Sequence, residues 1–152
     1  MTGAQYERDL VNAFESCGWR ALRAPGSGGV TQRDSPDVLA GKAHPQTTSN
    51  GDPLSRAIAI ELKSTSSTTA YVTSEEVTAL ERFAIDFGAE PRLAVKFKGT
   101  GTRTAFWLVE PTEARIVEGS GRHGLPEDTI EDRADMVILP ATKTMEAEIR
   151  QL

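Results

Sequence analysis

The sequence predicts an α/β domain in which helices flank a central mixed β-sheet. Three observations lead to this prediction: an amphipathic helical segment at 4–17, an alternating strand at 56–63, and a helical segment between that strand and an apolar strand at 92–97. A helix that joins two strands of one sheet makes a crossover, which leaves the strands parallel and the helix on a face of the sheet. The length of 152 residues fits a single domain.

The first predicted helix, residues 4–17, has one apolar face. At 100° per residue its apolar side chains fall within an arc of about 160°; they are Tyr6, Leu10, Val11, Ala13, Phe14 and Cys17. Glu7 lies inside this arc, where a carboxylate is costly unless a metal, a cation or hydrogen bonds compensate it. A side chain that reaches water from the edge of the arc is the alternative, and both interpretations stay open.

The segments that follow are shorter. Strands are predicted at 19–24 and 35–40, separated by the flexible glycine-rich loop of residues 25–29. No Gly-Lys-Ser/Thr follows this loop, so it is not a Walker A loop. Polar and turn-forming residues dominate 41–53, which predicts an exposed, mobile loop.

The strand at 56–63 alternates between two faces. One face carries Ile58, Ile60 and Leu62, and the other carries Ala57, Ala59, Glu61 and Lys63. The strand therefore presents a carboxylate and an ammonium side by side, next to small residues that leave room for a ligand. A solvent-exposed ion pair on an ordinary strand is the alternative.

A capping box opens the second predicted helix, with Thr73 as the cap and Glu76 reaching back. Its apolar stripe consists of Val77, Leu80, Phe83, Ala84 and Phe87. Gly88 and Pro91 end the helix, and strands at 92–97 and 104–109 follow.

The chain divides into a core domain, residues 1–110, and an acidic C-terminal extension, residues 111–152, that packs on or continues it. The core carries a net charge of −1 and the extension −4. In the extension we expect short strands at 116–117 and 136–139 and a terminal helix at 142–152.

Several classes of protein are excluded by composition. One Cys and two His leave no disulfide framework and no multi-histidine or cysteine metal site. No apolar run approaches the ~20 residues of a membrane span, and the N-terminus lacks a signal-peptide pattern. We therefore expect a cytoplasmic protein without a membrane partner.

Three acids and one lysine converge in this predicted core: Glu7, Asp37, Glu61 and Lys63. Pro36-Asp37 followed by Glu61-Leu62-Lys63 matches the PD-(D/E)xK nuclease signature. The bare pattern arises often by chance, but here its two halves lie on adjacent predicted strands. Asp37, Glu61 and the Leu62 carbonyl offer the oxygen ligands that Mg²⁺ prefers, with Glu7 as a further candidate. Lys63, one pleat beyond Glu61, can orient the attacking water or hold the phosphate.

The chain also resembles the archaeal Holliday junction resolvase family over about residues 3–109. The matching segments, in order, are Gly3–Arg8, Arg23–Ser27, Pro36-Asp37, Glu61–Lys63, Phe83–Gly88 and Leu93–Phe97. The resemblance implies a restriction-endonuclease-like core and a homodimeric, Mg²⁺-dependent enzyme, with Mn²⁺ as a candidate substitute. The longer 41–55 loop and the acidic extension depart from the family pattern.

The resemblance also implies roles for individual residues. Glu7, Asp37, Glu61 and Lys63 take the catalytic positions. The basic residues Arg8, Arg23 and Lys96 take positions that support DNA binding or cleavage, and Ser27 falls in a mobile loop that contacts DNA.

The leading hypothesis is an endonuclease that resolves four-way DNA junctions in recombination and repair. Its partners would be junction DNA and a second copy of the chain, with a sliding clamp or a helicase as further candidates. The alternatives are another PD-(D/E)xK restriction or repair endonuclease, a junction-binding protein without catalysis, and a purely structural domain.

Overall fold

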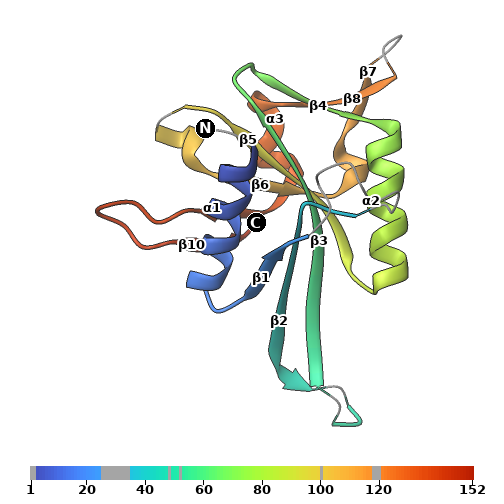
Figure 1. Cartoon of the computed structure of the whole chain (residues 1–152), viewed down its shortest axis with the longest axis vertical. Helices are drawn as coiled ribbons and strands as arrows, with labels where there is room; N and C mark the ends of the chain where they lie inside the picture. The colour runs from blue at the N-terminus through green and yellow to red at the C-terminus, as the bar shows by residue number, and fades with distance from the viewer. Residues whose placement is uncertain (1–2, 25–34, 48, 52, 100, 118–120) are drawn as a thin grey trace.

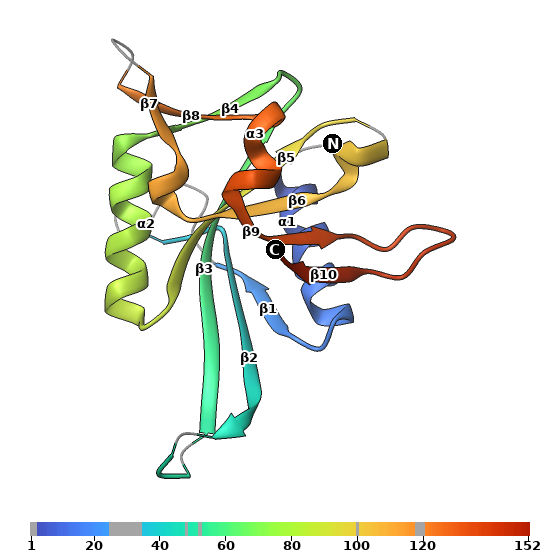
Figure 2. The same cartoon turned by 180° about the vertical axis from the view of Figure 1, so that it is seen from behind.

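The structure, a computed structural model of the chain, describes residues 3–24, 35–47, 49–51, 53–99, 101–117 and 121–152. Its largest element is a seven-stranded mixed sheet with strand order β1-β2-β3-β5-β6-β9-β10. Helix α1 (Gly3–Ser16) covers one face of this sheet and α2 (Ser74–Phe87) covers the other (Figures 1 and 2). The predicted α/β architecture is confirmed.

The remaining elements have the following bounds. The strands of the large sheet are β1 Arg20–Arg23, β2 Val38–Thr47, β3 Pro53–Thr65, β5 Glu90–Phe97, β6 Phe106–Val109, β9 Ala134–Leu139 and β10 Glu148–Gln151. A second sheet of order β4-β8-β7 consists of β4 Thr69–Thr73, β8 Arg122–Pro126 and β7 Arg115–Val117. Helix α3 spans Glu127–Arg133, and short 3-10 helices span Gly101–Thr104 and Pro111–Glu113.

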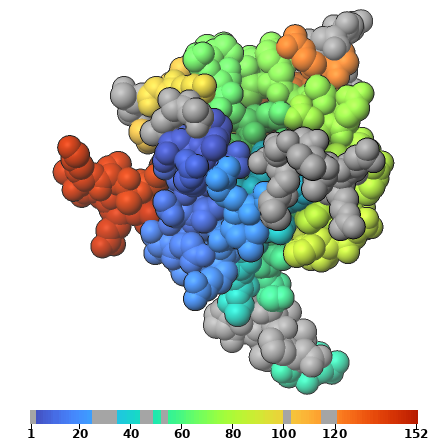
Figure 3. Space-filling view, viewed as in Figure 1, coloured from blue at the N-terminus to red at the C-terminus, as the bar shows by residue number. Residues whose placement is uncertain are grey.

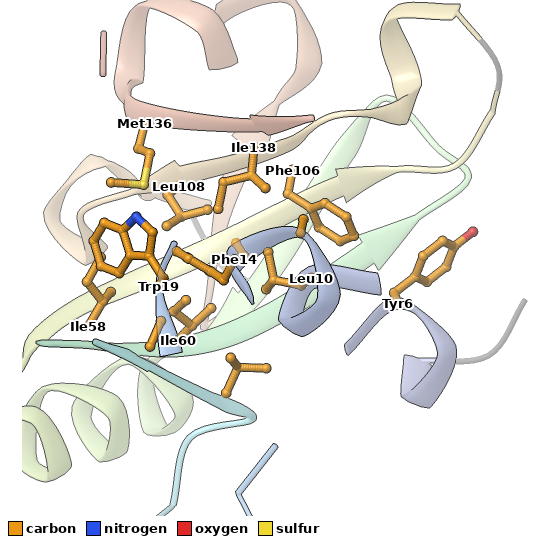
Figure 4. Packing of buried hydrophobic residues seen from close by; sticks show 14 residues of the cluster. Tyr6, Leu10, Phe14, Trp19, Ile58, Ile60, Phe106, Leu108, Met136 and Ile138 are labelled. Atoms are coloured by element: carbon orange, nitrogen blue, oxygen red, sulfur yellow. The ribbon is translucent and has the colours of Figure 1, made fainter. Parts of the chain in front are cut away.

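The apolar face of α1 forms one core with the large sheet. Leu10 and Phe14 are fully buried, and the Phe14 ring meets Trp19 edge to face at 5.2 Å between centroids (Figure 4). Ile58 and Ile60 of β3 point into the same core. Gly18 ends the helical segment with φ +87°, a value that glycine adopts without strain.

The opposite face of β3 contributes to a second core, beneath α2. There Ala59 packs in a cluster with Leu80 of α2 and Val95 of β5, all at 3% exposure or less. The predicted alternation of β3 is therefore confirmed, and it places Glu61 and Lys63 on the α2 side of the sheet.

The connections around β3 also match the prediction. β2 and β3 form an antiparallel hairpin, and α2 joins β3 to the parallel strand β5. Helix α2 begins at the expected capping box, in which Thr73 Oγ1 accepts from the Glu76 N–H at 3.1 Å. It ends at Gly88, whose φ is +83°.

The prediction of a loop over 41–53 was wrong, because most of this segment continues the β2–β3 hairpin. Pairing runs through Ala43↔Ser55 and, after an irregularity, to Thr47↔Pro53. The hairpin projects from the body of the molecule (Figures 1 and 2), and Lys42 and Ala43 are exposed. Exposed strand residues such as these two need no apolar alternation, so the polar composition of the segment is similar to that of a loop. Asn50-Gly51 is a strong hairpin signal, and Gly51 has φ +83°.

The prediction of a terminal helix over 142–152 was also wrong. The Thr142 hydroxyl accepts from the Met145 N–H at 3.1 Å, which favours a turn, and β10 then pairs antiparallel with β9. Ile149 lies opposite Ile138 and packs on the α1 core, whereas Met145 and Leu152 are exposed. Strand pairing therefore prevails over the weak helical pattern.

The C-terminal segment thus extends the large sheet through β9 and β10, and the β9–β10 connection projects to one side (Figure 3). None of the described helices is long and apolar enough to cross a membrane. Ser27 and the rest of 25–34 lie outside the described residues.

Candidate active site

Asp37 stands immediately before β2, tied to the strands on both sides. Its N–H donates to the Ile60 carbonyl at 2.8 Å, and its carbonyl accepts from the Ala24 N–H at 3.0 Å. Its carboxylate Oδ2 accepts from the Leu62 N–H at 2.8 Å. The side chain is therefore fixed against the backbone of β3, at the residue between Glu61 and Lys63.

Glu61 and Lys63 project from β3 beside this contact. Their side chains are 21% and 24% exposed, and Lys63 Nζ lies 4.0 Å from Glu61 Oε1. The Lys63 ammonium donates to Oε2 of Glu76, in the first turn of α2. The structure therefore brings together Asp37, Glu61 and Lys63, as the sequence predicted.

The carboxylates repel one another in a partly buried site. Burial, reinforced by the charges of Asp37, Glu76 and Glu7, raises the pKa of Glu61 to about 8, although Lys63 opposes the shift. Burial also raises the pKa of Asp37 against the opposing hydrogen bond from the Leu62 N–H. A bound cation would relieve this repulsion, so the electrostatics of the site favour one.

The pKa of Glu76 shifts in the opposite direction from those of Asp37 and Glu61. Burial opposes its charged form, but the hydrogen bonds from Lys63 and from the Thr73 backbone hold the pKa of Glu76 below its ordinary value. It is the ionised partner of Lys63 in this site.

Glu7 is compensated by a cation. Its Oε1 lies 3.2 Å from Nε of Arg23, and the two side chains are 14% and 33% exposed. Glu7 is mostly shielded from water, and Arg23 supplies the compensating charge that an inward carboxylate requires. Glu7 also raises the pKa values of Asp37 and Glu61, which places its charge near theirs.

The donor set fits a hard divalent cation. Among the described residues no group of three or more His, Cys, Asp or Glu side chains has the geometry to hold a metal. Two carboxylates, Asp37 and Glu61, remain, and Mg²⁺ is commonly bound by one or two carboxylates with waters completing its shell. The Leu62 carbonyl can add an oxygen. It faces the same side of β3 as the Leu62 N–H. The β2–β3 ladder stops at Val38↔Ile60, two residues before Leu62, so no residue of β2 pairs with Leu62.

The basic residues assigned by resemblance to DNA occupy different environments. Arg8 is exposed on α1, where its guanidinium donates to the Gln5 side chain at 3.5 Å. Lys96 is 7% exposed, and its ammonium donates to the Arg103 carbonyl at 2.6 Å. Burial lowers the pKa of Lys96. This placement ties the Lys96 ammonium to the backbone of the 3-10 helix Gly101–Thr104, and the role of Lys96 toward DNA stays a prediction.

From the sequence, Glu76 is predicted to belong to the capping box of α2 and to nothing else. The box fixes where α2 begins, but the pairing with Lys63 depends on how α2 packs over the end of β3. That packing requires the crossover geometry, which residue spacing alone does not give.

Raising the pH should destabilise the metal-free protein through Glu61. The pKa of Glu61 is about 8 in the folded chain and near 4.5 otherwise, so the folded chain retains a proton that the unfolded chain releases. This contribution to stability is complete below about pH 4.5 and is lost as the pH rises through 8. Thermal unfolding in EDTA should show a larger fall in Tm between about pH 5 and about pH 9 for wild type than for Glu61→Gln. An equal fall in Tm for wild type and Glu61→Gln would contradict the raised pKa of Glu61. The control is Glu75→Gln, at an exposed position, which should show the same fall in Tm as wild type.

Known proteins include relatives of this chain. The model of the family "Archaeal holliday junction resolvase (hjc)" matches residues 1–120. The chain is 31% identical over 97 residues to the crossover junction endodeoxyribonuclease Hjc of Methanocaldococcus jannaschii, covering 64% of this chain and 60% of that protein. It is 34% identical over 94 residues to the Hjc of Archaeoglobus fulgidus, covering 62% and 60%. The alignment thus spans less than two thirds of each relative.

A solved structure shares the fold. The crystal structure of Archaeoglobus fulgidus Hjc, a Holliday junction resolvase from an archaeal hyperthermophile, matches with a TM-score of 0.67 and 27% identity. The match covers 87% of this chain and 94% of that one. The fold is restriction-endonuclease-like, as the resemblance implied.

Proposed function

Because this chain belongs to the archaeal Holliday junction resolvase family, we propose that it is a metal-dependent endonuclease that cuts four-way DNA junctions. The observation that carries the proposal is that Asp37 lies beside Glu61 and Lys63, near the C-terminal end of β3. We expect it to act on DNA in the cytoplasm.

The residues divide the chemistry of phosphodiester hydrolysis among them. Asp37, Glu61 and the Leu62 carbonyl would hold Mg²⁺, which when bound stabilises charge on the phosphate and acidifies a water. Mn²⁺ has similar ligand preferences and is the expected substitute. Lys63 orients the nucleophile or holds the phosphate, and Glu7 adds negative charge that favours cation binding.

Labelled junctions test this function directly. The protein should cut a four-way junction in Mg²⁺ or Mn²⁺, leave a duplex of matched sequence intact, and lose cleavage in EDTA. Cleavage of duplex at one defined sequence would instead indicate another endonuclease of the superfamily. Junction binding without cleavage in either metal would indicate a non-catalytic protein.

We also propose a homodimer whose interface includes the exposed end of the α2 stripe. Phe87 is 57% exposed and stacks on Phe83 at 5.3 Å between centroids. Phe87 also lines an apolar groove with Leu22 of β1, which is 52% exposed. Burial of such a contiguous apolar surface favours association, and a two-fold dimer is the commonest assembly.

Phe87→Asp should therefore convert the protein to a monomer that still folds, because the ring is largely exposed. Sedimentation at micromolar concentration measures the change. Ile85→Asp is the matched control, since Ile85 is 80% exposed on the same helix but does not line the groove with Phe87. A Phe87→Asp protein that sediments as a dimer would show that the interface does not depend on Phe87.

Arg8 should contribute to junction affinity through phosphate contact. Arg8→Ala should weaken binding and reduce the slope of log K against log salt by about one, because one fewer counterion is released. Junction binding in EDTA at several salt concentrations gives this slope. Lys143→Ala, an exposed change on the β9–β10 connection, is the control. An unchanged slope for Arg8→Ala would show that Arg8 does not contact a DNA phosphate.

A further inference from the structure

Glu76 links the start of α2 to the lysine of the proposed active site. Its Oε1 accepts from the Thr73 backbone N–H at 3.1 Å, and its Oε2 accepts from the Lys63 ammonium. The Glu76 N–H in turn donates to Thr73 Oγ1. The two oxygens of one carboxylate therefore bind two different elements, the cap of α2 and the side chain of β3.

This arrangement restricts a side chain that is otherwise flexible. A lysine has a four-carbon stem and an ammonium that forms no fixed fork with its partners. Lys63 is 24% exposed and Glu76 is 31% exposed, so the pair is partly shielded from water. The second carboxylate near the ammonium, Glu61, lies 4.0 Å away.

The backbone of Thr73 makes the anchor rigid. The Glu76 carboxylate is bound to the backbone of Thr73, and α2 is itself held against the sheet by the buried side chains Val77 and Leu80. An ammonium bound to this carboxylate is therefore positioned relative to the sheet, and so relative to Asp37 and Glu61. An ordinary surface ion pair has no such backbone anchor and contributes little to the stability of the fold.

We propose that Glu76 is a positioning residue for Lys63, which it holds in place to act on the scissile phosphate or its nucleophile. The inference rests on the proposed nuclease function. It assigns to one glutamate two tasks, capping α2 and orienting the lysine, that substitutions can separate.

Glu76→Gln separates the two tasks. A glutamine amide oxygen still accepts from the Thr73 N–H, so the capping box and the fold persist. The amide NH₂ that would face Lys63 is a donor and cannot accept from the ammonium. Single-turnover cleavage at saturating junction should slow by about 10- to 100-fold, as for supporting residues of other active sites. Junction affinity in EDTA should stay at the wild-type value.

Two control variants distinguish positioning from stability. Glu75→Gln removes the same charge from the same turn at an exposed position. Thr73→Ala removes the hydroxyl cap but leaves the Glu76 carboxylate available to Lys63. Both should cut at close to the wild-type rate, even if Thr73→Ala lowers Tm. A Thr73→Ala protein that slows as much as Glu76→Gln would overturn the proposal in favour of a purely structural role.

A second readout does not depend on cleavage. In ¹⁵N spectra of the lysine side chains, the Lys63 ammonium signal, identified by its loss in Lys63→Arg, should move in Glu76→Gln and stay in place in Glu75→Gln. An unmoved signal, or wild-type cleavage by Glu76→Gln, would overturn the inference. A wild-type protein that leaves every junction intact would instead refute the proposed function, and the inference would fall with it.

Discussion

Replacing Asp37 with Asn should abolish cleavage of a four-way junction and leave junction affinity at the wild-type level. The amide oxygen of Asn still accepts from the Leu62 N–H, so the contact that fixes the side chain against β3 is retained. What is lost is the negative charge beside Glu61, which the proposed metal site would need in order to hold a divalent cation. The expected loss of cleavage rate exceeds about 100-fold, more than supporting residues around a metal contribute.

Junction cleavage and junction affinity are both measured on the same preparation of each protein. Affinity comes mainly from phosphate contacts distributed over the surface, so it should survive the change of one carboxylate. Asp86→Asn, an exposed change on α2, should cut as wild type does. Glu61→Gln and Lys63→Ala should lose cleavage as Asp37→Asn does. Full cleavage by the Asp37→Asn protein would refute the assignment of this site.

The centre of this fold could be predicted because its local signals agree with its packing. In β3, the alternation of Ile58 and Ile60 with Ala59 matches two cores on opposite faces of one strand. The Thr73 to Glu76 capping box defined the start of α2 without any knowledge of the sheet. The convergence of Asp37 and Glu61 followed from the hairpin between their strands.

The errors arose where pairing partners decide the structure. The polar 41–53 segment extends as a hairpin through backbone pairing with no core beneath Lys42 and Ala43. Residues 148–151 pair with β9, a contact that no local pattern encodes. Lys96 takes a position that by resemblance supports DNA binding or cleavage, which stays a prediction, and its ammonium lies 5.4 Å from the Phe106 ring centroid and donates to the Arg103 carbonyl. Residue type alone does not reveal such burial.

A mixed dimer with one Asp37→Asn subunit should nick one strand of a junction and leave the symmetry-related strand intact. The described residues of each chain bring Asp37 and Glu61 together at one place, so each chain would supply one copy of the proposed active site. A four-way junction has approximate two-fold symmetry, and its resolution requires two cuts placed symmetrically. A two-fold dimer would present one site to each of two opposing strands.

The measurement uses dimers purified through two different tags, one on each subunit, and a junction with each strand labelled in turn. Wild-type dimers should cut both opposing strands within one binding event, and Asp37→Asn homodimers should cut neither. The mixed dimer should give nicked junctions as its product, with paired cuts reduced to the level of the homodimer variant. Repeating the two-tag purification after the reaction controls for exchange of subunits. Paired cuts by the mixed dimer, or by Phe87→Asp monomers within a single binding event, would refute the symmetric mechanism, because one intact site would then be serving both strands.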